Sequence, residues 1–160
     1  MYNLHCTKKL LDRLKRPIAA PTETDIRLGN WYATVLFWKP QMVLVVNERT
    51  LLPVLLPLAP AATLVERFPQ AVGEALLALD VPEAVIAEEL QAMGYGSVCK
   101  TVNRSLIGML NEFSFLAESY RHHFGTSEPI AVMKKLVITP CRPIGYLSPR
   151  EALERVLRER

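Results

Sequence analysis

The 160-residue sequence lacks the short motifs that mark the best-known enzyme classes. It contains no Gly-x-x-x-x-Gly-Lys phosphate loop, no Gly-x-Gly-x-x-Gly turn, no His-Glu-x-x-His zinc motif and no Gly-x-Ser-x-Gly nucleophile elbow. Its three cysteines, Cys6, Cys99 and Cys141, are widely spaced and form no Cys-x-x-Cys pair, so we expect free thiols rather than disulfides or a zinc ribbon. The sequence therefore gives no sign of a metal site or a cofactor.

The sequence also has no uninterrupted apolar run long enough to cross a bilayer, which takes about 20 residues. Its most apolar stretch, residues 51–65, contains Pro53, Pro57 and Pro60, and proline disrupts a helix interior. Residues 1–16 contain no apolar segment followed by a small-residue cleavage site, so they do not resemble a signal peptide. We expect a cytoplasmic protein that does not insert into membranes.

The net charge of +3 is too small to indicate a nucleic-acid-binding protein by itself, but the charges are unevenly distributed. Residues 61–96 contain one Lys or Arg against six Asp or Glu, whereas residues 1–30 contain six against three and residues 97–160 contain ten against six. We therefore expect an acidic helical flank in the middle of the chain and more basic ends.

The composition, 50% apolar and 22% charged, is typical of a folded globular protein, and we expect residues 1–160 to form a single domain. The pattern predicts strands over residues 2–6, 31–38, 42–46, 51–58 and 96–102. The three strands between residues 31 and 58 should form an antiparallel meander, with a tight turn at residues 47–50. The third should lie at an edge, because its prolines cannot donate ladder hydrogen bonds.

The spacing of apolar residues predicts helices over residues 7–14, 61–80, 82–94, 103–123, 127–138 and 148–160. Thr7 and Ser127 are expected N-caps, and Pro69 should break or kink its helix. Ser148 and Glu151 match a capping box, which predicts an amphipathic C-terminal helix over residues 148–160. The fold class is therefore α+β: a small antiparallel sheet, made of the three-stranded meander plus one or two short strands, packed against about five helices.

The long helix predicted from residue 103 has two faces of different character. One is an apolar stripe of Leu106, Leu110, Phe113, Ala117 and Tyr120. The other carries Arg104, Gly108, Asn111, Phe115 and Glu118. Phe115 suggests that this second face is also covered, by the fold or by a partner. Gly108 suggests close approach of a backbone or a ligand, because glycine in mid-helix costs about 1 kcal/mol relative to alanine.

Several polar residues of the long helix are candidates for structural or binding roles. Asn103 is suited to be its N-cap. Arg104 and Asn111 lie two turns apart and can bind a carboxylate or phosphate, or else satisfy loop carbonyls. Glu112 can act as a general acid or base if it is partly buried.

A second group of candidates lies at the ends of the predicted strands and in the first helix. Asn30, Asn47, Glu48 and Thr50 are polar groups at strand ends, where sites often occur. Trp31 and Tyr32 can stack on bases or sugars, or belong to the core. Lys8 belongs to a basic cluster that also contains Lys9, Arg13, Lys15 and Arg16, which is either a solvated helix face or a phosphate contact.

Three segments, taken together, resemble a bacterial family known as domain of unknown function 6933. They are "CTKKLLDRL", "LGNWYATVLFW" continuing into "VLVVNERTLLPVLLPLAPAATLVERFP", and "NRSLIGMLNEFSFLAE". The similarity covers about residues 4–140, and we expect residues 141–160 to be individual to this chain. The resemblance implies an accessory or regulatory role in mobile-element or partner-protein systems and brings no catalytic residues. The positions that match its motifs are Lys8, Asn30, Trp31, Tyr32, Asn47, Glu48, Thr50, Asn103, Arg104, Gly108, Asn111 and Glu112.

Three functional hypotheses follow from these observations. The first is a non-catalytic binding or regulatory module that holds a protein partner, a second copy or an anionic group between the long helix and the strand-end turns. The second is a small hydrolase or nuclease, with Glu48 or Glu112 as the base and Lys8 or Arg104 stabilising charge. The third is nucleic-acid binding through the basic N-terminal helix.

Overall fold

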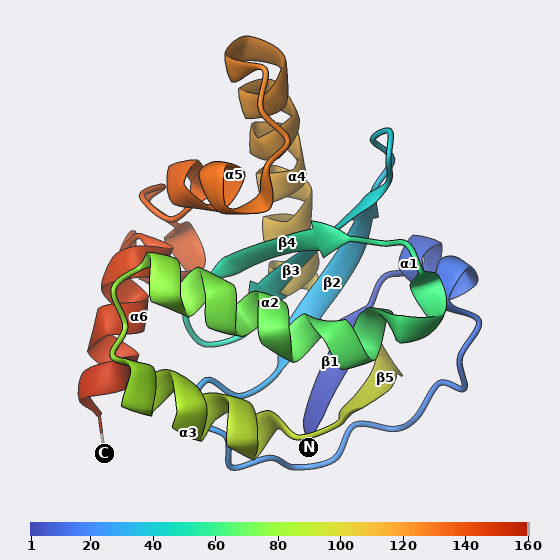
Figure 1. Ribbon diagram of the computed structural model, residues 1–160, viewed down its shortest axis with the longest axis horizontal. Coiled ribbons are helices and arrows are strands. Elements are labelled where there is room, and N and C mark those ends of the chain that lie inside the picture. Colours follow the sequence, from blue (N-terminus) through green and yellow to red (C-terminus); the bar gives the residue numbers. More distant parts are fainter. Residues whose placement is uncertain (160) are drawn as a thin grey trace.

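The computed structural model describes residues 1–159, which form one five-stranded sheet and six α-helices (Figure 1). The strands are β1 (Tyr2–Cys6), β2 (Trp31–Leu36), β3 (Met42–Asn47), β4 (Pro53–Pro57) and β5 (Gly96–Lys100). The helices are α1 (Lys8–Leu14), α2 (Leu64–Ala78), α3 (Glu83–Met93), α4 (Arg104–Phe124), α5 (Pro129–Leu136) and α6 (Pro149–Arg158). Two short 3₁₀ helices, η1 (Ala61–Thr63) and η2 (Arg142–Ile144), join these elements. The predicted α+β class is confirmed.

The sheet has the order β4-β3-β2-β1-β5 and is mixed, so the prediction of a purely antiparallel sheet is wrong. The antiparallel meander of β2, β3 and β4 is confirmed, and β4 lies at an edge as its prolines require. β1, however, pairs in parallel with both β2 and β5. The reason is the long return of the chain after β1, through α1 and residues 15–30, which brings β2 in at the same end as β1.

α2 covers one face of the sheet, where three aromatic rings meet. Trp31 packs edge-on against Phe68 of α2 with ring centroids 5.1 Å apart, and Tyr2 packs against the same ring at 5.7 Å. On the other face α4 packs against β2 and β3, while α5 lies against β4 (Figure 1). The apolar side chains of both faces and the sheet form one continuous buried cluster.

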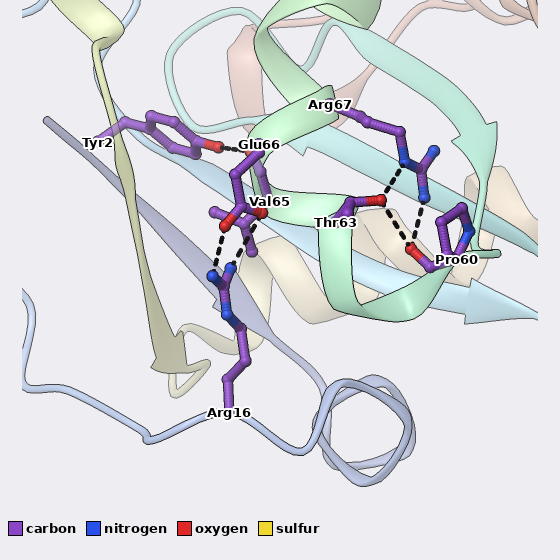
Figure 2. Close-up of polar contacts among 7 residues, drawn as sticks. All are labelled: Tyr2, Arg16, Pro60, Thr63, Val65, Glu66 and Arg67. Atoms are coloured by element: carbon purple, nitrogen blue, oxygen red, sulfur yellow. Dashed lines mark hydrogen bonds and ion pairs between the residues drawn. The ribbon is translucent and has the colours of Figure 1, made fainter.

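α2 continues through Pro69, so the break that was one of the two predicted effects of this residue does not occur. Pro69 has no N–H to donate to the carbonyl of Val65, four residues earlier. The Tyr2 hydroxyl supplies the missing donor, because it donates a 2.6 Å hydrogen bond to that carbonyl (Figure 2). Burial of Tyr2 raises its pKa, which keeps the hydroxyl protonated and able to donate.

The structure confirms the predicted N-cap of α6 but differs from the predicted N-caps of α5 and α1. The capping box of Ser148 and Glu151 is confirmed, whereas Arg160, the last residue of that predicted helix, lies outside the described residues. Glu128, not Ser127, caps α5: its two carboxylate oxygens accept from the backbone N–H groups of Ile130 and Ala131. Thr7 precedes α1 but makes no capping bond, and its hydroxyl instead lies 3.0 Å from that of Thr34. Within residues 1–159, none of the helices is both long and apolar enough to span a membrane.

The substitution Tyr2→Phe should lower the free energy of unfolding by about 1–3 kcal/mol, because it leaves the buried Val65 carbonyl without a donor. In a Pro69→Ala background the backbone N–H gained at position 69 can donate to that carbonyl. The cost of Tyr2→Phe should therefore be markedly smaller there. Urea unfolding of the four proteins of this double-mutant cycle measures the difference, and equal costs in both backgrounds would contradict this account.

Candidate functional site

Asn47, one of the predicted site residues, is fully buried and organises the turn after β3. Its side-chain amide donates to the carbonyls of Leu28 (2.8 Å) and Asn30 (3.2 Å). Its Oδ1 accepts from the backbone N–H groups of Arg49 and Thr50 and from the Thr50 hydroxyl. Both ends of the amide are thus engaged within the chain, which gives Asn47 and Thr50 a structural role.

Glu48 and Asn30 belong to the same end of the sheet and are also bound within the fold. Glu48 Oε1 accepts a 2.8 Å hydrogen bond from the Asn30 N–H. Asn30 Oδ1 in turn accepts from the backbone N–H and the side-chain amide of Asn3. These bonds join the amino ends of β1 and β2 to the turn at the end of β3.

The hollow beside Glu48 does not bring the predicted catalytic groups together. It has a volume of about 480 Å³ and is lined by Thr24, Asp25, Ile26, Arg27, Gly29, Glu48, Arg49, Val156 and Glu159. Glu112, Lys8 and Arg104 are not among its lining residues. The side chain of Arg49 is held by Glu159 (2.7 Å) and the Arg27 carbonyl (2.6 Å). Within residues 1–159, no group of three or more His, Cys, Asp or Glu side chains is placed to hold a metal ion.

The two aromatic candidates lie on opposite faces of the sheet, and both are buried. Trp31 is fully enclosed beneath α2. Tyr32 stacks on His5 with ring centroids 4.4 Å apart and an angle of 11° between the planes. Burial raises the pKa of Tyr32, and the nearby carboxylate of Glu48 adds to this effect. Burial also lowers the pKa of His5, which favours the neutral imidazole. Neither ring offers an open face for a base or sugar.

The candidate residues on α4 are exposed, and Asn103, which directly precedes the helix, forms its N-cap. The Leu106 N–H donates to Asn103 Oδ1 at 3.1 Å, so the predicted cap is confirmed. Arg104, Gly108, Asn111, Glu112 and Phe115 all lie open to solvent, and Phe115 is 74% exposed. Apart from the adjacent residues and the backbone of its own helix, a Cβ built on Gly108 meets no atom within 4 Å in the described chain. The expectation that the fold itself covers this face or approaches Gly108 closely is therefore wrong. Lys8 is likewise exposed, at the start of α1.

The structure also contains a groove that the sequence analysis did not predict. It runs between α2 and α3, which lie side by side (Figure 1), and has a volume of about 540 Å³. Its walls are Gln70, Gly73, Glu74 and Leu77 of α2 and Glu83, Ile86, Ala87 and Leu90 of α3. Each set follows the i, i+3, i+4, i+7 spacing of one helix face. We call this feature the α2–α3 groove.

Glycine and leucine determine the shape of the α2–α3 groove. A Cβ on Gly73 would lie 3.0 Å from Leu90 Cδ1, so glycine permits the two helices to pack closely at that point. Leu77 stands on the outer wall with 55% of its surface exposed. The sequence held two signals of this feature: a glycine in mid-helix at residue 73 and the acidic character of residues 61–96.

The charge around the α2–α3 groove is negative and largely unneutralised. Arg67 is the one basic residue between positions 61 and 96. Its guanidinium donates to the Pro60 carbonyl and the Thr63 hydroxyl at the N-terminal end of α2 (Figure 2). It also donates to the carbonyls of Pro57 and Leu58. Arg16 reaches the same end of α2 and pairs with Glu66 (Figure 2). Glu74 and Glu83, on the groove walls, form no ion pair with any residue of the described part of the chain.

These features define a mixed α+β domain with an apolar, acid-rimmed groove between two helices. The chain belongs to the family described as domain of unknown function 6933, whose sequence profile matches residues 3–152. The family similarity therefore extends beyond residue 140, where the sequence analysis placed its end, and includes most of the segment expected to be individual to this chain. No curated protein and no solved structure matches the chain.

Replacing Asn47 by alanine should lower the free energy of unfolding by about 2–4 kcal/mol, since it leaves several buried backbone groups without partners. Asn111→Ala is the matched control, because Asn111 is exposed on α4. Its effect should stay within about 0.5 kcal/mol. Chemical denaturation of both variants tests this prediction, and similar losses in the two would refute the structural role of Asn47.

Gly108→Ala should raise the free energy of unfolding by about 0.5–1 kcal/mol, because alanine favours the helix and no atom of the described chain obstructs its methyl group. Thermal and urea unfolding of the purified protein provide the measurement. A destabilised variant would show that the site around Gly108 is more crowded than the structure indicates.

Proposed function

We propose that the protein is a non-catalytic binding module that takes a helical segment of a partner protein into the α2–α3 groove. The observation that carries the proposal is the groove itself, with apolar walls at helical spacing and Leu77 exposed above it. A third helix laid between α2 and α3 would bury Leu77 and Leu90, following the mode in which amphipathic helices dock into apolar grooves.

The charge of the groove specifies the chemistry of the partner. Glu74 and Glu83 on the two walls, with Asp80 in the connection between the helices, would face the flanks of a docked helix. The segment that fits is therefore an amphipathic helix with an apolar stripe bordered by Lys or Arg. Opposite charges at the rim chiefly increase the rate of association and the specificity for such a partner.

The proposal assigns the module to the bacterial cytoplasm, as an accessory or regulatory component that acts through its partner. All three cysteines are free thiols buried in the fold, an arrangement that suits a reducing compartment. The hydrolase alternative receives less support, because neither Lys8 nor Arg104, the proposed stabilising cations, lines the hollow beside Glu48. The exposed face of α4 remains a second candidate docking surface for the same kind of function.

The test uses the partner that co-purifies with the tagged protein from its host, followed by titration of the purified pair. Leu77→Glu should weaken the affinity at least about tenfold, since it places a charge in the apolar contact and adds repulsion to the acidic rim. Ile138→Glu is the matched control, because Ile138 is also an exposed aliphatic residue but lies outside the groove.

Hydrogen exchange of the complex locates the contact independently of the variants. The proposal expects new protection over residues 70–77 and 83–90 and none on the exposed face of α4. Protection of α4, with loss of binding in Arg104→Ala and Asn111→Ala rather than in Leu77→Glu, would contradict the groove and identify the α4 face instead.

A further inference from the structure

Phe37 is an exposed aromatic residue at the tip of the β2–β3 hairpin, where it contributes little to the core. It follows directly after β2, and 52% of its surface is accessible. The next residue, Trp38, is buried, with the Arg121 guanidinium 4.7 Å from its ring. The buried Trp38 thus anchors the hairpin tip, while the ring of Phe37 lies at the surface.

Two cations of α1 lie over the Phe37 ring. Lys9 Nζ is 5.9 Å and Arg13 Cζ is 5.3 Å from its centroid. These residues are four positions apart and therefore on the same helix face. Because α1 and the hairpin are separate in sequence, their juxtaposition is a product of the fold.

The basic residues of α1, of its C-cap Lys15 and of the hairpin tip are not neutralised by acidic side chains. We define the α1–hairpin patch as Phe37 together with Lys8, Lys9, Arg13, Lys15 and Lys39. Each of its five basic residues is exposed, and none forms an ion pair with another part of residues 1–159. Arg16, in contrast, is occupied by Glu66. Asp12 is the one acidic residue of α1, so the patch carries a clear positive excess.

We infer that the α1–hairpin patch binds single-stranded nucleic acid, with phosphates on the lysines and arginine and an unpaired base stacked on Phe37. Cationic surfaces with an aromatic platform bind single strands in this way, because every base has a face that can stack. Base pairs in a duplex keep their faces covered, so a single ring at a hairpin tip favours the unpaired strand. The patch has only one large apolar side chain, which makes a lipid surface the weaker fit.

This inference does not depend on the α2–α3 groove, because the two surfaces share no residue. The test is fluorescence anisotropy of a labelled oligouridine, about 12 nucleotides long, with the full-length protein at about 50–200 mM salt. Phe37→Ala should weaken binding at least about fivefold, whereas Phe37→Tyr should preserve it. Lys9→Ala with Arg13→Ala should reduce the slope of log affinity against log salt by about 1.4, since two phosphate contacts are lost.

The matched control is Phe124→Ala with Lys135→Ala, which removes a second exposed ring and the cation 3.9 Å above it on α4 and α5. This control should bind oligouridine like the native protein, and thermal unfolding confirms that all variants are folded. Absence of binding at the lowest salt concentration, or equal losses in the Phe37 and Phe124 variants, would overturn the inference. Stronger binding to vesicles containing anionic phospholipid than to oligouridine would also overturn it and indicate a membrane contact.

Discussion

The hydrogen bond from the Tyr2 hydroxyl to the Val65 carbonyl is the constraint on which the arrangement of this protein depends. It compensates for the donor that Pro69 removes from α2, and it ties that helix to β1, an internal strand of the sheet. Gly96 completes the arrangement, because a Cβ there would lie 2.5 Å from the Tyr2 ring. The strand β5, the strand β1 and the helix α2 thus fit together only with these residue types in place.

The position of α2 decides which surfaces the rest of the molecule offers. Since α2 is fixed on one face of the sheet, α3 packs against it and the acidic α2–α3 groove opens on the outer side. Arg16 and Arg67 are drawn to the N-terminal end of α2, where they bind Glu66 and the preceding carbonyls. Arg27 pairs with Glu88 of α3, whereas Glu74 and Glu83 on the groove walls form no ion pair within residues 1–159, so the groove keeps its negative charge.

Local sequence patterns predicted most helices and strands of this fold. The features that they did not predict depend on contacts between segments that are distant in the sequence. The meander, its proline-bearing edge and the Ser148 capping box depend on neighbouring residues, so they could be read directly from the sequence. The parallel pairing of β1 could not, because a five-residue strand carries no mark of its direction. Likewise, Pro69 alone predicts a break or kink, because the sequence does not show that the Tyr2 hydroxyl donates to the carbonyl that Pro69 leaves without a partner. Of the candidate residues, Asn47 and Thr50 determine the turn after β3, and Trp31 belongs to the core. The α2–α3 groove could not be predicted, because it forms between two helix faces and no sequence motif indicates that these faces pack together.

The place of β1 within the sheet also has a consequence for the order in which the protein can fold. β1 lies between β2 and β5, so one of its edges stays unpaired until residues 96–100 have left the ribosome. Until then the nascent chain exposes unpaired backbone groups of β1, a strand that is buried in the folded protein, and such an edge is a template for pairing with other chains. Contacts of such long sequence separation also slow folding. The first strand of this sheet in chain order is therefore among the last to obtain both of its neighbours.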